Sequence, residues 1–197
     1  MRPLLMIRSL SLLALVFLTQ ACQQLPEPKG RDVRVMEVGR LEQLNPNDIV
    51  VAPLQMASEE DLSVPELALR QAFVKALIRR RYAPLALEYV DSGVVEASYR
   101  TGILDEDAVC EIIVHDWNDS MWEGRRAIEG DLEVRLVDPA DPLGPVLWSA
   151  RLARRFDFAG DDSGHISEPV QYTNALAHIA QEIMAVMPAR RAQPGFE

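Results

Sequence analysis

The sequence predicts an α+β domain in which helices pack on a mixed sheet of about five strands. A nearly unbroken apolar run over residues 108–117 predicts a central strand that is covered on both faces. Strict alternation of polar and apolar residues over 128–136 predicts a strand with one face in water. Two segments with apolar residues at helical spacing, 64–81 and 169–187, predict the helices that cover the sheet. The predicted order is β-α-β-(α)-β-β-β-α.

The first strand and the first long helix are predicted between residues 48 and 81. The β-branched run at 48–52 predicts a strand that ends at Pro53, because proline cannot donate a hydrogen bond to a strand ladder. Ser63 and Glu66 have the spacing of a capping box, so the helix is expected to begin there. Its apolar stripe consists of Leu69, Ala72, Phe73, Ala76 and Leu77.

The segment between this helix and the central strand is harder to divide into elements. Residues 82–90 are mostly apolar and predict a second strand. Residues 92–107 fit no single pattern, and 94–99 are compatible with one or two turns of helix.

Three consecutive strands are predicted in the second half of the chain. The last of them, 146–158, alternates with Trp148 on its apolar side and Arg151 on its polar side. The preceding segment, 138–145, is rich in proline and predicts a hairpin turn. We therefore expect Trp148 and Leu132 to point into the core from adjacent strands.

The last helix carries a continuous apolar stripe. This stripe is either part of the core or a face for a partner, and the core is favoured because one face of the sheet has to be covered. The stripe consists of Tyr172, Leu176, Ile179, Ala180, Ile183 and Met187.

Residues 1–21 have the layout of a secretory signal peptide. Arg2 and Arg8 precede the uncharged apolar run 10–18, and no acidic residue occurs before Glu27. The apolar run is shorter than the roughly 20 residues that a membrane-spanning helix requires. A cleaved signal is therefore predicted instead of a permanent transmembrane anchor.

Cys22 stands directly after this signal. The preceding Leu18-Thr19-Gln20-Ala21 resembles the bacterial lipobox, in which a small residue precedes a cysteine that is diacylated before the signal is removed. Two acyl chains on Cys22 would hold the protein at a membrane without a spanning helix. The alternative is that Cys22 is an ordinary residue beside a signal peptidase site. Gln23, in place of aspartate, resembles the sorting signal for the outer membrane, which implies a protein that faces the periplasm.

The remaining chain is predicted to hold one acidic domain. Residues 22–46 are expected to form the lipidated cysteine and its tether, 47–188 a single periplasmic domain, and 189–197 a flexible tail. Without the signal, 18 basic and 30 acidic residues remain, a net charge of −12. Nucleic acid is thus an unexpected partner, because clustered Lys and Arg bind its phosphates. Cys110 lies in an apolar run and is predicted to be a buried, unreactive thiol.

Six short motifs between residues 47 and 187 resemble those of small bacterial envelope lipoproteins. They are Ala52-Pro53-Leu54, Arg80-Arg81-Tyr82, Asp107-Ala108-Val109, Asp116-Trp117, Leu136-Val137-Asp138 and Leu147-Trp148-Ser149. The domain of these proteins is similar to the amino-terminal domain of TolB and to the curli-secretion lipoprotein family. In particular, the chain resembles an uncharacterised lipoprotein family known from a neisserial surface antigen. The resemblance implies a non-catalytic accessory role in envelope assembly, export or transport.

Residues for a specific chemistry are sparse. The sequence has no nucleophile elbow, phosphate-binding loop or dinucleotide fingerprint, so no enzyme, cofactor or metal is predicted. The alternative is a periplasmic metal-dependent or hydrolytic enzyme that uses His115, Asp116 and Asp119. Asp161–Asp162 with His165 form a second cluster of this kind, and both clusters are expected to be solvated loop residues.

Arg79, Arg80 and Arg81 close the first long helix. Cations in a last turn stabilise the helix dipole, which gives these residues a structural explanation. The alternative is that they bind a partner protein or anionic lipid. We expect the partners to be other envelope proteins and the domain to be a monomer or weak dimer. Pro53 and the prolines of the hairpin turn discourage pairing of sheet edges, and the net charge adds repulsion between copies.

Overall fold

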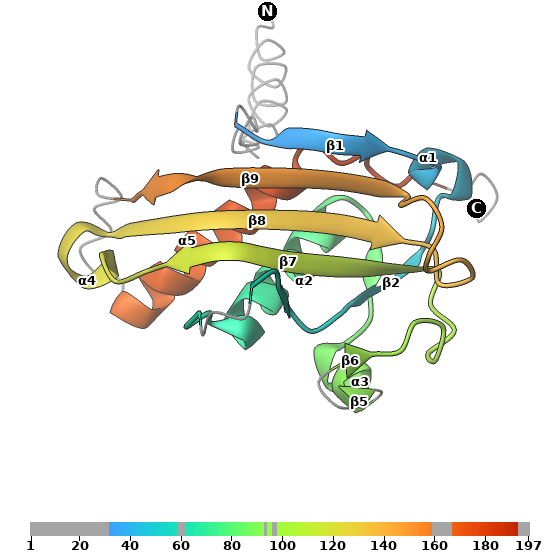
Figure 1. The fold of residues 1–197 in the computed structure, drawn as a ribbon, viewed down its shortest axis with the longest axis horizontal. Coiled ribbons are helices and arrows are strands. Elements are labelled where there is room, and N and C mark those ends of the chain that lie inside the picture. Colours follow the sequence, from blue (N-terminus) through green and yellow to red (C-terminus); the bar gives the residue numbers. More distant parts are fainter. Residues whose placement is uncertain (1–31, 59–61, 93, 96–97, 159–166, 193–197) are drawn as a thin grey trace, which may run out of the picture.

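The computed structural model of the chain describes residues 32–58, 62–92, 94–95, 98–158 and 167–192. These residues form a mixed sheet of seven strands with helices packed on it (Figure 1), which confirms the predicted α+β class. The strand order is β1-β9-β8-β7-β2-β4, and the short β3 also pairs with β7. The strands are β1 (Arg34–Val38), β2 (Asp48–Val51), β3 (Gln55–Met56), β4 (Ala83–Pro84), β7 (Ala108–Asn118), β8 (Ala127–Val137) and β9 (Trp148–Asp157).

The two long helices cover one face of this sheet. Helices α2 (Glu66–Arg79) and α5 (Glu168–Met184) pack side by side behind the strands in Figure 1. The core between the two layers contains Trp148 and Leu132, each only 1% exposed, which confirms their predicted orientation. The shorter helices are α1 (Leu41–Leu44), α3 (Leu87–Ser92) and α4 (Trp122–Arg125).

Helix α5 and Cys110 confirm two further predictions about the core. The predicted stripe of α5 is buried from Leu176 to Met187, and Tyr172 is half-buried. Cys110 is fully buried, and this burial raises the pKa of its thiol to about 12. Among the helices in the described residues, none has the length and apolar character needed to cross a membrane.

Helix α2 begins without the predicted capping box. Pro65 occupies the N-cap position, and no side chain caps the helix. The Glu66 carboxylate instead accepts a hydrogen bond of 3.3 Å from the Leu54 N–H and lies 4.0 Å from Arg70. Proline is suited to the start of a helix because the first N–H groups have no partner inside it. Glu66 therefore fastens the helix to the chain that follows β2.

Residues 82–90 do not form the predicted second strand. They form the two-residue strand β4 at the sheet edge and then helix α3. The Ala83 and Leu85 N–H groups donate to β2, so Pro84 turns its missing N–H to the outer edge of the sheet, where no further strand can pair with it. Residues 94–99, whose pattern was ambiguous and compatible with one or two turns of helix, contain the two short strands β5 (Val94–Val95) and β6 (Ser98–Tyr99).

A small second core lies on the sheet face opposite α2 and α5. Val90 of α3 packs there with Val50 of β2, Val109 of β7 and Val137 of β8. These strand residues alternate with neighbours that belong to the main core, so they point to the other side of the sheet. This second core covers only one end of that face.

The first strand of the sheet lies earlier in the chain than the sequence predicts. Strand β1 and helix α1 lie within residues 22–46, which were expected to form a tether. Strand β1 pairs antiparallel with β9, with Arg34 opposite Arg151 and Val38 opposite Trp148. All residues of β1 are exposed, so the strand lacks the buried side that a periodic pattern would reveal.

Candidate functional site

Beyond the second core, the described residues leave one sheet face uncovered, and we call it the open face. Its side chains come from β7, β8 and β9, and they lie in cross-strand rows because the three strands pair antiparallel. Both signs of charge occur in these rows. The rows are Glu111–Arg135–Ser149, Ile113–Glu133–Arg151, Asp116–Asp131–Ala153 and Asn118–Glu129–Arg155.

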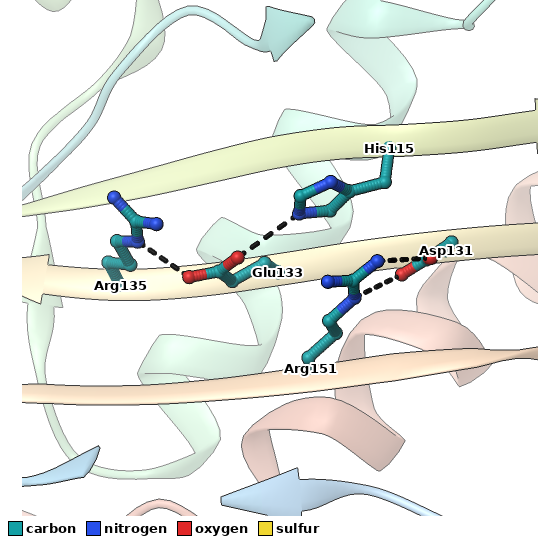
Figure 2. Close-up of polar contacts among 5 residues, drawn as sticks. All are labelled: His115, Asp131, Glu133, Arg135 and Arg151. Atoms are coloured by element: carbon teal, nitrogen blue, oxygen red, sulfur yellow. Dashed lines mark hydrogen bonds and ion pairs between the residues drawn. The ribbon is translucent and has the colours of Figure 1, made fainter. Parts of the chain in front are cut away.

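Glu133 is the centre of one charge network on the open face (Figure 2). Its carboxylate accepts a hydrogen bond of 2.6 Å from Arg135 Nε, and its second oxygen lies 3.1 Å from His115 Nε2. His115 reaches this carboxylate from β7, where the pairing with β8 is irregular between Val114 and Asp116. Such an irregularity redirects a side chain that would otherwise follow the strand pattern.

Asp131 and Arg151 form a second pair beside this network (Figure 2). Arg151 donates two hydrogen bonds to the carboxylate, of 2.7 Å from Nε and 2.6 Å from Nη2. A bidentate pair of this kind fixes the orientation of both side chains. The hydrogen bonds from Arg151 also lower the pKa of Asp131 below its ordinary value, despite partial burial.

The network keeps Glu133 ionised as well. Its side chain is only 12% exposed, and this burial alone would raise the pKa. Hydrogen bonds from Arg135 and His115 outweigh the burial, so the pKa of Glu133 falls below its ordinary value. The carboxylates at the centre of the open face are therefore ionised at neutral pH and are held in position by their neighbours.

The residues proposed for metal or hydrolytic chemistry do not come together. His115 is engaged by Glu133, and Asp116 lies opposite Asp131 in the sheet. Asp119 accepts a hydrogen bond from the Tyr172 hydroxyl, away from His115. Within the described ranges, no group of three His, Cys, Asp or Glu side chains has the arrangement needed to hold a metal ion. The second predicted cluster, at 161–165, lies outside the described residues.

The three arginines at the end of α2 have different environments: Arg80 makes contacts within the domain, whereas Arg79 and Arg81 are exposed. The Arg80 guanidinium donates a hydrogen bond to the Met187 carbonyl, and the Arg80 carbonyl accepts one of 2.9 Å from the Arg190 N–H. Arg80 thus ties α2 to the segment that follows α5. Arg79 and Arg81 are exposed, and Arg81 has a φ of 69°, a conformation that favours glycine. The end of α2 therefore leaves Arg79 and Arg81 as candidates for partner contacts.

Part of the predicted tail is bound to the body of the domain. The Arg190 side chain donates a hydrogen bond of 3.0 Å to the Pro46 carbonyl. The Arg191 N–H donates one to the Asn45 side-chain oxygen, and the Arg191 guanidinium donates one to the Glu42 carboxylate. A cavity of about 310 Å³ lies beside this segment. Its lining consists of Val38, Gly39, Leu41, Glu42, Gln43, Leu147, Trp148, Pro188 and Arg191.

Comparisons with known proteins give only distant structural similarity. No family model matches the chain, and no curated protein matches it. A PelC dodecamer from Paraburkholderia phytofirmans is similar at a TM-score of 0.44 and 15% identity, over 77% of this chain and 97% of that one. Lipoprotein GNA1162 from Neisseria meningitidis is similar at a TM-score of 0.46 and 20% identity, over 68% of this chain and 99% of that one. A hypothetical protein, CT253 from Chlamydia trachomatis, is similar at a TM-score of 0.41 and 14% identity, over 71% of this chain and 94% of that one. The lipoprotein family suggested by the motifs stays a prediction.

Proposed function

We propose that this chain is a lipid-anchored protein of the outer membrane that binds other envelope proteins as a non-catalytic component of an assembly, export or transport system. Acylated Cys22 supplies the anchor, and the open face supplies the binding surface. The observation that carries the proposal is this face, a part of the sheet without helix cover whose central charges are fixed by their neighbours.

The charge pattern of the open face suits recognition of a folded protein. The chain as a whole carries a net charge of −10, yet Arg135, Arg151 and Arg155 alternate with acids on this face. Alternating charges select a partner with the complementary pattern and repel others. Because Glu133 and Asp131 already hold their partners, little side-chain freedom is lost when a protein binds.

An apolar element accompanies these charges. Ile113 lies in the row of Glu133 and Arg151 and is 8% exposed, and Ala153 is exposed beside Asp131. Interfaces commonly surround a small apolar centre with polar groups. A catalytic role has weaker support, since His115 and Asp119 are engaged by different partners.

Site-specific photocrosslinking in a Gram-negative host tests the binding surface. A photoreactive amino acid replaces Ala153 or Asp116, which are exposed on the open face. Matched control positions are Leu67 and Ile78 on α2, which are 58% and 57% exposed. We expect discrete adducts with other envelope proteins from the open face and none from the controls. The additional change Arg135→Glu should lower the adduct yield several-fold, because it reverses a charge of the pattern.

Two results would contradict the proposed binding surface. The first is the absence of heterologous adducts at both Ala153 and Asp116 although the variants are present at parental levels. The second is an equal yield of the same adducts from Leu67 and Ile78. In that case the helical layer, and not the open face, would be implicated.

A further inference from the structure

Strand β1 is the edge strand at one end of the sheet. It is the terminal strand in the order of the sheet, and within the described residues its outer side pairs with no other strand. Its apolar side chains are exposed, with Val38 at 75%, Met36 at 49% and Val35 at 38%. An exposed edge with apolar side chains is a ready template for pairing with another strand.

The opposite edge is more strongly protected than β1, which carries a register shift but is longer and contains no proline. Strand β4 has only two residues, and one of them is Pro84. Pro53, expected to protect an edge, follows β2, which lies between β7 and β4 inside the sheet. Strand β1 has five residues and contains neither proline nor lysine, the residues that usually discourage edge pairing.

An irregularity in β1 brings two opposite charges onto one face. The register with β9 shifts between Val35 and Glu37, so that Arg34 and Glu37 lie opposite Arg151 and Ser149. Both of those β9 residues belong to the open face, and Arg34 and Glu37 therefore share it. The Arg151 guanidinium is already held by Asp131, and neither Arg34 nor Glu37 has an ion pair with a described residue.

We propose that β1 pairs antiparallel with β1 of a second copy of this chain. With Arg34 of each copy opposite Glu37 of the other, twofold symmetry forms two ion pairs from charges that have no partner within the described domain. Val35 and Met36 of the two copies meet at the symmetry axis, and the two sheets become continuous. The charges give the edge a complementary partner in itself, as an isologous interface requires. This inference does not rest on the proposed function, because the contact is made by the β1 edge, although Arg34 and Glu37 lie on the open face.

Charge reversal provides the test. The full chain is purified in a neutral detergent, and self-association is measured by sedimentation equilibrium at matched solvent density. We expect a monomer–dimer equilibrium for the parent. Arg34→Glu or Glu37→Arg alone places like charges opposite each other twice, and each should raise the dissociation constant by about tenfold or more.

Two combinations of these changes should restore the dimer. The double variant Arg34→Glu with Glu37→Arg exchanges the charges within one chain and should associate within about threefold of the parent, since the same pairs form in reverse. An equimolar mixture of the two single variants should form a heterodimer, because one copy presents two acids and the other two bases. Retention of native circular dichroism in each variant separates lost association from lost folding.

The outcomes distinguish this interface from others. Concentration-independent monomer in the parent would overturn the proposal, as would association that both single reversals leave unchanged. A larger closed assembly that is insensitive to the reversals would place the contact elsewhere. Association lost in the single variants but not restored by either combination would overturn the antiparallel register.

Val38→Lys, at a 75% exposed position of the edge, should weaken the dimer without altering the fold.

Discussion

Trp148→Ala is expected to lower the free energy of unfolding by about 3 to 5 kcal/mol. The indole is the largest side chain of the main core that is essentially removed from water, with 1% exposed. Its truncation leaves a cavity between β9 and the helical layer that surrounding side chains cannot fill. A loss of this size is a large part of the total stability of a domain.

Urea unfolding followed by circular dichroism measures this loss. Val38→Ala is a matched control, because Val38 lies opposite Trp148 in the β1–β9 pair but is 75% exposed. The control should change stability by less than about 0.5 kcal/mol. A shift below about 1 kcal/mol for Trp148→Ala would show that the indole does not support the core.

Gly39→Ala is expected to destabilise the domain by about 2 to 3 kcal/mol. A Cβ at this position would lie 2.3 Å from the Val146 carbonyl oxygen and 3.0 Å from that of Leu147. Both are backbone atoms, so the chain must separate instead of rotating a side chain. The separation strains the hydrogen bonds that the Gly39 and Leu41 N–H groups donate to the Leu147 carbonyl.

Gly124→Ala provides a control of opposite sign. A Cβ added at Gly124 in helix α4 has no neighbour within 4 Å. Alanine favours a helix over glycine by about 0.5 to 1 kcal/mol, so this variant should be slightly more stable than the parent. Equal unfolding midpoints in urea for the two alanine variants would contradict the close approach of Gly39 to the Val146 and Leu147 carbonyl groups, just before β9.

The centre of the sheet is predictable from the sequence because its strands carry clear patterns. Strand β7 is buried on both faces over much of its length, and β8 alternates between the core and the open face. Strand β1 has neither signal, since its pairing with β9 is made by backbone groups and its side chains stay exposed. Residues 82–90 were assigned to a strand because they are mostly apolar. In the structure these apolar residues serve two different cores, which a single period cannot represent.

The sequence also predicts which charged residues share the open face, but it does not predict which of them form ion pairs with each other. Alternation over 128–136 predicts that Asp131, Glu133 and Arg135 share one face of the sheet in water. The structure confirms the shared face, but Glu133 is buried there by its neighbours. Which charges meet depends on the register of three strands. The irregularity in β7 that turns His115 to Glu133 has no signature in the sequence. His115 was therefore grouped with Asp116 and Asp119, its neighbours along the chain.

Anchoring through Cys22 is the most direct test of the proposed function, because only an anchored protein is held beside membrane-bound partners. The measurement is the distribution of the full chain between membrane and soluble periplasmic fractions of a Gram-negative host. Cys110→Ala is the matched control, since Cys110 is buried and its loss leaves the anchor intact. We expect the parent and Cys110→Ala to stay with the outer membrane and Cys22→Ala to be released into the soluble fraction. A Cys22→Ala protein that remains as membrane-bound as the parent would contradict the lipid anchor.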